Sequence, residues 1–142
     1  MILGKKDVRI ILAQLEEQSP CIRRRIGAFL ISKEGKIVKA YNGNLEKPCN
    51  KNFCLREKMK VKSGVVHSLC FGIHAEIRLV LHCLENGTDL KDSVVYCTYS
   101  PCIDCATVLA TYEIKAFYFL FEYPDDRYIS VFDNAGIKYG LI

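Results

Sequence analysis

Two short stretches of this sequence, His74–Glu76 and Pro101–Cys105, contain side chains that bind metal ions and transfer protons. Cysteines at positions i and i+3 of a helix lie on the same side, and in its first turn the helix dipole favours their thiolate form. His74 can supply a third ligand and leave the fourth tetrahedral position to water, which is the ligand count of a catalytic zinc ion. The spacing therefore predicts a catalytic zinc site built by His74, Cys102 and Cys105.

Glu76 follows the histidine closely enough for its carboxylate to face the same site if a helix begins there. A carboxylate beside such a metal can take a proton from water and return it to a leaving group. The order His-x-Glu followed by Pro-Cys-x-x-Cys is the signature of zinc-dependent nucleobase deaminases. Either stretch alone is more often structural or redox-active, so it is their combination that predicts a deaminase with Glu76 as its proton shuttle.

A second group of possible zinc ligands lies between residues 42 and 71, where no helical or strand periodicity is visible. A long irregular stretch inside a compact domain is uncommon unless a functional or covalent constraint holds it. Ligands with C-x4-C and H-x2-C spacing fill a tetrahedral site and leave no place for water, so this site would be structural. We expect it to consist of Cys49, Cys54, His67 and Cys70; in the alternative interpretation these cysteines are reduced and bind nothing.

Composition narrows the class of protein. The chain has 142 residues, 50% hydrophobic and 25% charged, which is typical of a soluble domain with its own core. We expect a single domain over residues 1–142 with a zinc-stapled insertion at about 42–71. Eight cysteines without a predicted secretory signal or membrane span indicate metal binding or catalysis in the cytoplasm rather than disulfides. The formal charge of +4 is too small to indicate a nucleic-acid partner.

Periodicity predicts strands that alternate with helices. Helices are expected over 7–18 and 73–86, the second with the apolar stripe Ile73, Ile77, Val80, Leu81 and Leu84. Strands are expected at 26–32, 36–41, 93–100 and 115–123, a helix at 102–113, and finally a short helix, a turn at 134–136 and a terminal strand. This alternation predicts a three-layer α/β domain with a partly parallel sheet.

The sequence resembles the deoxycytidylate (dCMP) deaminases, in particular the bacterial and phage-type branch of the cytidine deaminase superfamily. The likeness runs through SPCIRRRIGAFLIS, AYNG, CNKNFCLRE, SGVVHSLCFGIHAE, YCTYSPCIDCA and EYPDDRY…NAGI, which stand in the expected order. It implies an α/β/α fold around a five-stranded mixed sheet and the hydrolysis of dCMP to dUMP and ammonia. It also implies a homohexamer that dCTP activates and dTTP inhibits.

Carried over position by position, the resemblance assigns the zinc ligands and the proton shuttle to the residues named above, and it suggests a second zinc in the insertion. The substrate contacts that we expect are Asn42, Ser100 and the backbone of Ala75, which would hold the pyrimidine carbonyl. A phosphate needs charged donors, and Arg23–Arg25 precede the first strand. Strand alternation would send Arg24 to the face opposite its neighbours, so we assign the phosphate to Arg24 alone. Alternatively, these arginines are only exposed or bind a neighbouring subunit.

The chain departs from the family pattern at three places. The family continues its signature as His-Ala-Glu-x-Asn-Ala, whereas Arg78 and Leu79 stand here; Ala40 replaces a glycine, and Tyr112-Glu113 replaces Ala-Gly. Arg78 would lie one helical turn beyond His74, at the rim of the pocket, in a subunit contact or on the surface.

Two other interpretations of the function stay open. One is a different zinc deaminase, acting on adenosine in tRNA or on free cytidine. The other is a non-catalytic, zinc-stabilised nucleotide-binding module. Glu76 argues against such a module, because a purely structural site has no use for a proton shuttle.

Overall fold

The computed structural model describes residues 3–43, 54–64, 70 and 72–142. Two of the expected ligands of the second zinc site, Cys49 and His67, lie outside these residues. Within the described part of the chain, no helix is long and apolar enough to cross a membrane.

Five strands form a mixed sheet in the order β2-β1-β3-β4-β5. β1 is antiparallel to β2 and β3, whereas β3, β4 and β5 are parallel to one another. The elements are α1 (Lys5–Gln18), β1 (Gly27–Ile31), β2 (Ile37–Tyr41), α2 (Leu55–Lys58), α3 (Ala75–Asn86), β3 (Val94–Tyr99), α4 (Ile103–Thr111), β4 (Ala116–Phe121), α5 (Tyr128–Ala135) and β5 (Lys138–Leu141). The five-stranded mixed sheet is confirmed, and so is the predicted order of elements, except that the short helix α2 lies in the stretch 42–71, where the sequence predicts no helix or strand.

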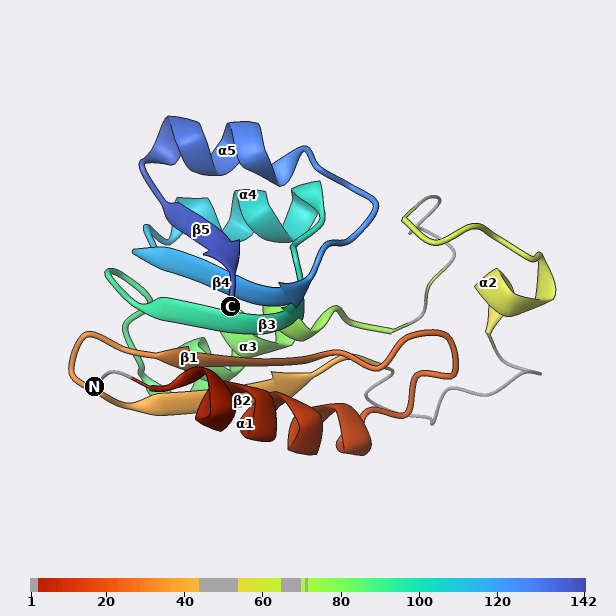
Figure 1. The fold of residues 1–142 in the computed structure, drawn as a ribbon, viewed down its shortest axis with the longest axis horizontal. Coiled ribbons are helices and arrows are strands. Elements are labelled where there is room, and N and C mark those ends of the chain that lie inside the picture. Colours follow the sequence, from red (N-terminus) through yellow and green to blue (C-terminus); the bar gives the residue numbers. More distant parts are fainter. Residues whose placement is uncertain (1–2, 44–53, 65–69, 71) are drawn as a thin grey trace.

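Alternating side chains of β1 create two hydrophobic cores, one on each face of the sheet. Ala28 and Leu30 pack in the larger core with α3, α4 and α5, whereas Phe29 and Ile31 pack against α1. Figure 1 shows α4 and α5 on the side of the sheet opposite α1. The three-layer architecture is therefore confirmed.

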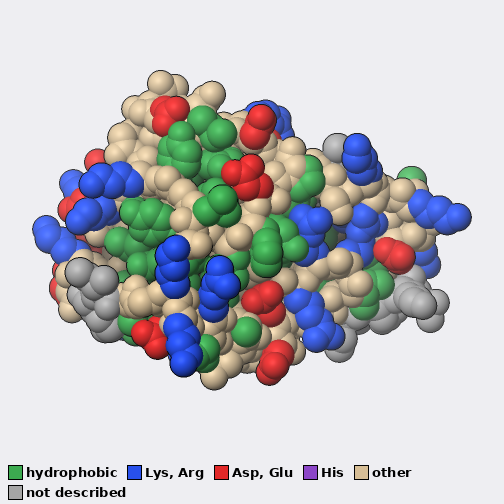
Figure 2. All heavy atoms as spheres, viewed as in Figure 1, with side chains coloured by type: hydrophobic (Ala, Val, Ile, Leu, Met, Phe, Trp, Pro, Cys, Tyr) green, Lys and Arg blue, Asp and Glu red, His purple; other side chains and the backbone are tan. Residues whose placement is uncertain are grey.

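Helix α1 covers only the β2-β1-β3 part of its face of the sheet. Tyr96, Leu120 and Ile142 are only partly buried at the border of the α1 core. Hydrophobic side chains gather over this part of the molecule in the space-filling view (Figure 2). In the single chain, the β4-β5 part of this face is open.

The apolar stripe predicted for α3 is wrong at two of its five positions. Leu81 and Leu84 are exposed, whereas Glu76 and Arg78 are buried together with Leu79. The sequence pattern misleads here because two charged side chains of this helix point inward. A buried charge needs partners inside the protein, so these two positions mark a polar site within the fold.

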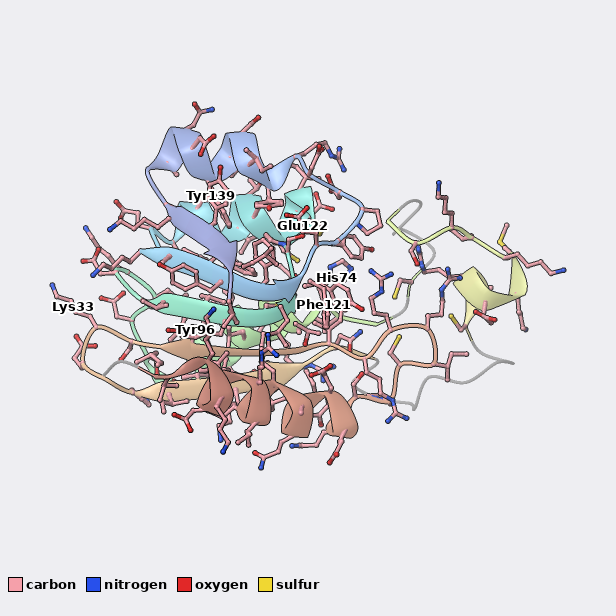
Figure 3. All side chains as sticks on the ribbon, viewed as in Figure 1. Lys33, His74, Tyr96, Phe121, Glu122 and Tyr139 are labelled. Carbon is pink, nitrogen blue, oxygen red and sulfur yellow. The ribbon has the colours of Figure 1, made fainter. Side chains whose placement is uncertain are left out.

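That polar site lies at one end of the sheet. The carboxyl ends of the parallel strands β3 and β4 meet there, and the antiparallel strand β1 begins there. Figure 3 shows His74 at this end, facing the α2 segment, whereas Lys33 lies at the opposite end. Because the carboxyl edge of parallel strands is where open α/β sheets bind ligands, the candidate site lies where this topology favours it.

Candidate active site

Three ligand atoms, one from α3 and two from α4, converge at this edge. The Nδ1 atom of His74 lies 3.5 Å from Sγ of Cys102 and 3.4 Å from Sγ of Cys105. All three atoms lie within 4.8 Å of one another. A zinc ion with bonds of about 2.3 Å to sulfur and 2.0–2.1 Å to nitrogen separates its tetrahedral ligands by about 3.5 Å. The arrangement therefore fits one tetrahedral zinc ion.

Two helix starts bring these ligands together. His74 is the N-cap residue of α3 and Cys102 is the N-cap residue of α4. The backbone N–H groups of Arg78 and Ala106 donate to their carbonyls and so close the first turns. Because both helices direct their positive ends at the cluster, their dipoles favour thiolate there.

One of the two thiols is held as a thiolate. Hydrogen bonds from Cys105 and His74 lower the pKa of Cys102 to about 4. The bond to Cys102 raises the pKa of His74 to about 9 and, together with burial, raises the pKa of Cys105 well above its ordinary value. Cys102 therefore carries negative charge near neutral pH, and a metal ion that binds all three ligands would displace the protons of His74 and Cys105.

Glu76 lies in the first turn of α3, only 5% exposed, and lines the same cavity as His74. Burial raises the pKa of its carboxyl group. The thiol of Cys97 on β3 donates a hydrogen bond to Oε1 of Glu76 over 3.2 Å. The sequence alone does not predict this contact, because nothing in it shows that β3 passes beside this carboxylate.

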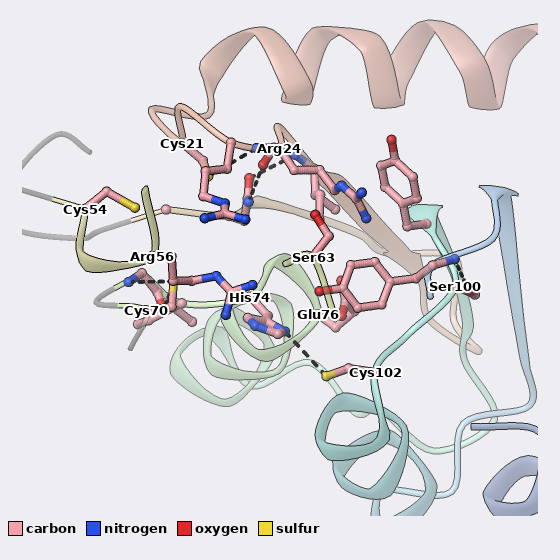
Figure 4. A pocket seen from close by; sticks show the side chains of 18 residues that line it. Cys21, Arg24, Cys54, Arg56, Ser63, Cys70, His74, Glu76, Ser100 and Cys102 are labelled. Atoms are coloured by element: carbon pink, nitrogen blue, oxygen red, sulfur yellow. Dashed lines mark hydrogen bonds between the residues drawn. The ribbon is translucent and has the colours of Figure 1, made fainter. Parts of the chain in front are cut away.

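A cavity opens in front of the cluster and collects most of the expected substrate contacts (Figure 4). Asn42, Arg24 and Ser100 all line it. Ala75 is fully buried at the start of α3, where backbone N–H groups have no partner within the helix. The topology thus brings residues from four separate segments to one site.

The side chain of Asn42 joins several of these segments. Its Oδ1 accepts hydrogen bonds from Ser19 Oγ over 2.6 Å and from the N–H of Ile26 over 2.9 Å. Its Nδ2 donates to the carbonyl of Arg24 over 2.8 Å. Asn42 therefore fixes the segment before β1 to the end of β2, and it contributes to the cavity wall at the same time.

Arg24 packs against two neighbouring aromatic rings, whose centres lie 6.4 Å apart. Its guanidinium carbon is 4.5 Å from the centre of the Tyr99 ring and 5.0 Å from that of Tyr123. Its buried Nη1 has no hydrogen-bond partner among the described residues. An oriented, desolvated guanidinium of this kind suits the recognition of an anion.

The alternation expected for the arginine run is wrong. β1 begins only at Gly27, so Arg23 and Arg24 precede the strand and both line the cavity. Arg23 donates to the carbonyl of Val61 and lies 3.9 Å from a carboxylate oxygen of Glu57. Arg25 is exposed, as one of the alternatives allowed. Arg23 thus attaches the 54–64 segment to the site.

The 54–64 segment supplies cavity residues that sequence reasoning missed. Arg56 is 7% exposed, lines the cavity and donates to the carbonyl of Lys62 over 3.1 Å. Ser63 and two of the expected ligands of the second zinc, Cys54 and Cys70, line the same cavity. These two members of the second predicted cluster therefore border the first site.

A further residue, Asp125, supports the metal-binding helix from outside the cavity. Its Oδ2 accepts a hydrogen bond from the N–H of Ile103, the first residue of α4, over 2.9 Å. Both carboxylate oxygens also accept from Arg127. The hydrogen bonds from Arg127 and Ile103 hold the pKa of Asp125 well below its usual range. Ile103 and Asp125 are 22 residues apart in the sequence, so no local sequence pattern predicts this hydrogen bond.

Comparison with known proteins agrees with this geometry. The family model described as the cytidine and deoxycytidylate deaminase zinc-binding region matches residues 5–121. The deoxycytidylate deaminase of Schizosaccharomyces pombe is 27% identical over 127 residues, which are 86% of this chain and 38% of that protein. The deoxycytidylate deaminase of Enterobacteria phage T4 is 34% identical over 68 residues, 46% of this chain and 35% of that protein. The matched region thus spans little more than a third of these relatives.

Solved structures with the same fold cover nearly the whole chain. The dCMP deaminase of cyanophage S-TIM5, in complex with dCMP and dUMP, superposes with a TM-score of 0.76 at 20% identity, over 99% of this chain and 100% of that one. A diaminohydroxyphosphoribosylaminopyrimidine deaminase/reductase from Thermotoga maritima superposes with a TM-score of 0.68 at 16% identity, over 96% of this chain and 35% of that one. The fold is therefore that of these proteins.

Replacing Asp125 by alanine is expected to lower the free energy of unfolding by about 1–2 kcal/mol at pH 7 and to weaken zinc binding, because α4 loses the acceptor at its first turn. Since the pKa of Asp125 is depressed in the folded state, its contribution is complete above about pH 4 and is lost as the pH falls further. Urea unfolding at pH 7 and pH 3 measures both effects. The exposed neighbour Asp126→Ala is the control, and equal stability of the two variants at pH 7 would contradict the assignment.

Proposed function

Because the chain belongs to the cytidine and deoxycytidylate deaminase zinc-binding family, we propose that it hydrolyses dCMP to dUMP and ammonia. One observation carries the proposal: the His74, Cys102 and Cys105 cluster lies at a cavity that is also lined by a buried carboxylate and by the guanidinium of Arg24, whose buried Nη1 has no hydrogen-bond partner among the described residues. A metal, a proton shuttle and a phosphate contact are the three components that this reaction requires.

His74, Cys102 and Cys105 would hold a zinc ion, and their separations suit its tetrahedral coordination. When bound, zinc activates a water molecule by lowering its pKa towards neutrality. Three protein ligands, rather than four, are typical of catalytic zinc and leave a position for that water. This ligand set therefore supports a catalytic role more than a structural one.

Glu76 would carry the protons. Its buried carboxylate faces the cavity two residues after the histidine ligand, so it can accept a proton from the attacking water as that water adds to C4 of cytosine. It then delivers this proton to N3, takes the remaining proton from the hydroxyl group formed at C4, and passes it to the amine, which leaves as ammonia while the C4 carbonyl forms. Burial raises the pKa of Glu76, which suits a group that must both accept and release a proton.

The remaining cavity residues would bind the nucleotide. The backbone N–H of Ala75 would hold the pyrimidine carbonyl, and Asn42 would contact the sugar. Ser100 accepts a hydrogen bond from the N–H of Tyr123 over 2.7 Å, so it joins the ends of β3 and β4 at the cavity wall. Arg24, whose guanidinium lies against the Tyr99 and Tyr123 rings, would bind the 5′-phosphate.

We also propose that Cys54 and Cys70 bind a structural zinc ion together with Cys49 and His67. Cys54 is the N-cap residue of α2, and Cys70 lies three residues beyond His67 in the sequence. Four protein ligands fill the coordination sphere and would tie the insertion to the active site. Because Cys54 and Cys70 border the same cavity, this zinc would help to shape the nucleotide pocket.

A substrate panel tests the function. Ammonia release is measured for the zinc-loaded chain with dCMP, cytidine, deoxycytidine and a tRNA anticodon stem-loop. Turnover is expected with dCMP, far above that with the nucleosides, because only dCMP brings a phosphate to Arg24. No ammonia from any substrate, with zinc bound, would instead favour the non-catalytic binding module.

Glu76→Gln is expected to abolish turnover and to leave the zinc content unchanged, because this side chain moves protons and is not a ligand. Zinc is measured by atomic absorption in the same preparation as the assay. Loss of metal from this isosteric variant would contradict the assigned role.

Cys54→Ser is expected to remove one zinc equivalent per chain and to lower the melting temperature, since a structural zinc contributes directly to folding. Cys21→Ser is the control, because Cys21 is half-buried at the same cavity but belongs to neither zinc site. Identical zinc contents in the two variants would refute the structural site.

Arg24→Met is expected to raise KM for dCMP by about 10- to 100-fold, the usual cost of losing a charge-assisted hydrogen bond. Its kcat/KM for deoxycytidine, which has no phosphate, should stay within about twofold of the original value. The exposed Arg25→Met is the control. An equal loss on both substrates would show that Arg24 does not bind the phosphate.

A further inference from the structure

Arg78 is a buried cation that the deamination chemistry does not use. It is 4% exposed on α3, one turn beyond His74, so the surface position allowed by the sequence is wrong. A guanidinium is buried in a protein only where other groups compensate for its lost hydration. Its contacts therefore indicate what it does.

Those contacts lie on both sides of Asn42. The Nη2 atom of Arg78 donates to the carbonyl of Gly43 over 2.7 Å. Its guanidinium carbon lies 5.1 Å from the centre of the Tyr41 ring, within the range of a cation–π interaction. Tyr41 and Gly43 are the neighbours of Asn42 in the chain, so Arg78 contacts the segment immediately before and after this residue.

A backbone bridge joins the same segment to the metal-binding helix. Gly43 and Ile73 exchange two hydrogen bonds, of 3.1 and 2.9 Å, and Ile73 directly precedes His74. Gly43 has φ of +126°, and a Cβ atom there would lie 2.7 Å from Pro20. The close approach thus requires glycine, and its carbonyl is presented to Arg78.

We propose that Arg78 is a positioning residue, which holds Asn42 at a fixed distance from His74 and Glu76. The helix presents the metal ligand and the proton shuttle at its first turn, and Arg78 reaches from its second turn to the strand end that carries the nucleotide contact. A bound nucleotide would thereby be placed correctly against the reacting groups, although Arg78 is not among the residues that line the cavity. The family pattern has asparagine at this position, and asparagine is too short for the contacts that Arg78 makes with Tyr41 and Gly43. We call these two contacts of Arg78 the brace.

The kinetic consequence rests on the proposed function. Losing the brace should weaken nucleotide binding and leave the chemistry intact, because Ala75 and Leu79 remain fully buried and hold α3 in the core. Arg78→Met keeps most of the apolar stem and removes the donors. It should raise KM for dCMP about tenfold and change kcat by less than about twofold.

Hydrogen exchange gives a readout that does not depend on turnover. In Arg78→Met, the amides of residues 40–43 should exchange faster than in the original chain, because Gly43 loses one of its attachments. Arg78→Lys should bring both the KM for dCMP and the exchange of amides 40–43 part of the way back to their original values, since lysine supplies one donor to the Gly43 carbonyl. Tyr41→Leu should change KM in the same direction as Arg78→Met. Arg9→Met, at an exposed arginine of α1, is the control and should change neither quantity.

A higher KM for dCMP together with faster amide exchange at residues 40–43 in Arg78→Met supports the positioning role of Arg78. A lower melting temperature with unchanged KM and exchange would overturn it and leave Arg78 a purely structural residue. If the original chain does not turn over dCMP, the proposed function fails, and unchanged exchange at 40–43 would separately overturn the brace. If Arg78→Met does not fold, Arg78→Lys and Tyr41→Leu provide the same comparison.

Discussion

The convergence of one imidazole and two thiols at the starts of two helices is the constraint on which the rest of this structure depends. His74 and Cys102 are N-cap residues, so the ligands keep their separations only if α3 and α4 begin at the same place above the sheet. The parallel pair β3 and β4 sets that place, because the ends of both strands meet at its edge. Asp125 then holds the first turn of α4 from the following loop. The geometry of the metal site thus depends on the pairing of β3 with β4 as well as on the three ligand residues.

The same edge gathers groups that the sequence separates widely. β1 runs antiparallel to β3, so the segment before it, with Arg24, arrives beside the end of β3, with Ser100. Asn42 joins the end of β2 to that segment through its hydrogen bonds. A cavity with a metal cluster at one side and a guanidinium at another is the direct result of this mixed topology. The order of the strands therefore explains why the groups that we propose to bind a nucleotide lie at one edge of the sheet.

The sequence predicted what depends on local spacing. The His-x-Glu and Pro-Cys-x-x-Cys stretches indicated the cluster, and alternating periodicities indicated the order of helices and strands. It could not predict contacts between distant segments, such as the thiol of Cys97 on Glu76. It also misplaced the inner face of α3, because Arg78 is buried where the apolar pattern favoured Leu81. These errors coincide with the site, where inward-facing charges break the hydrophobic pattern that otherwise predicts burial.

The catalytic zinc site can be tested by X-ray diffraction at the zinc absorption edge, with crystals grown in the presence of zinc. An anomalous peak is expected between His74 Nδ1 and the sulfurs of Cys102 and Cys105, with a single non-protein ligand completing the tetrahedron. Glu76 is expected to lie beside that ligand and not to bind the ion. Zinc found elsewhere in the chain but absent from these three residues, or bound there by a fourth protein side chain, would show that the cluster is not a catalytic zinc site.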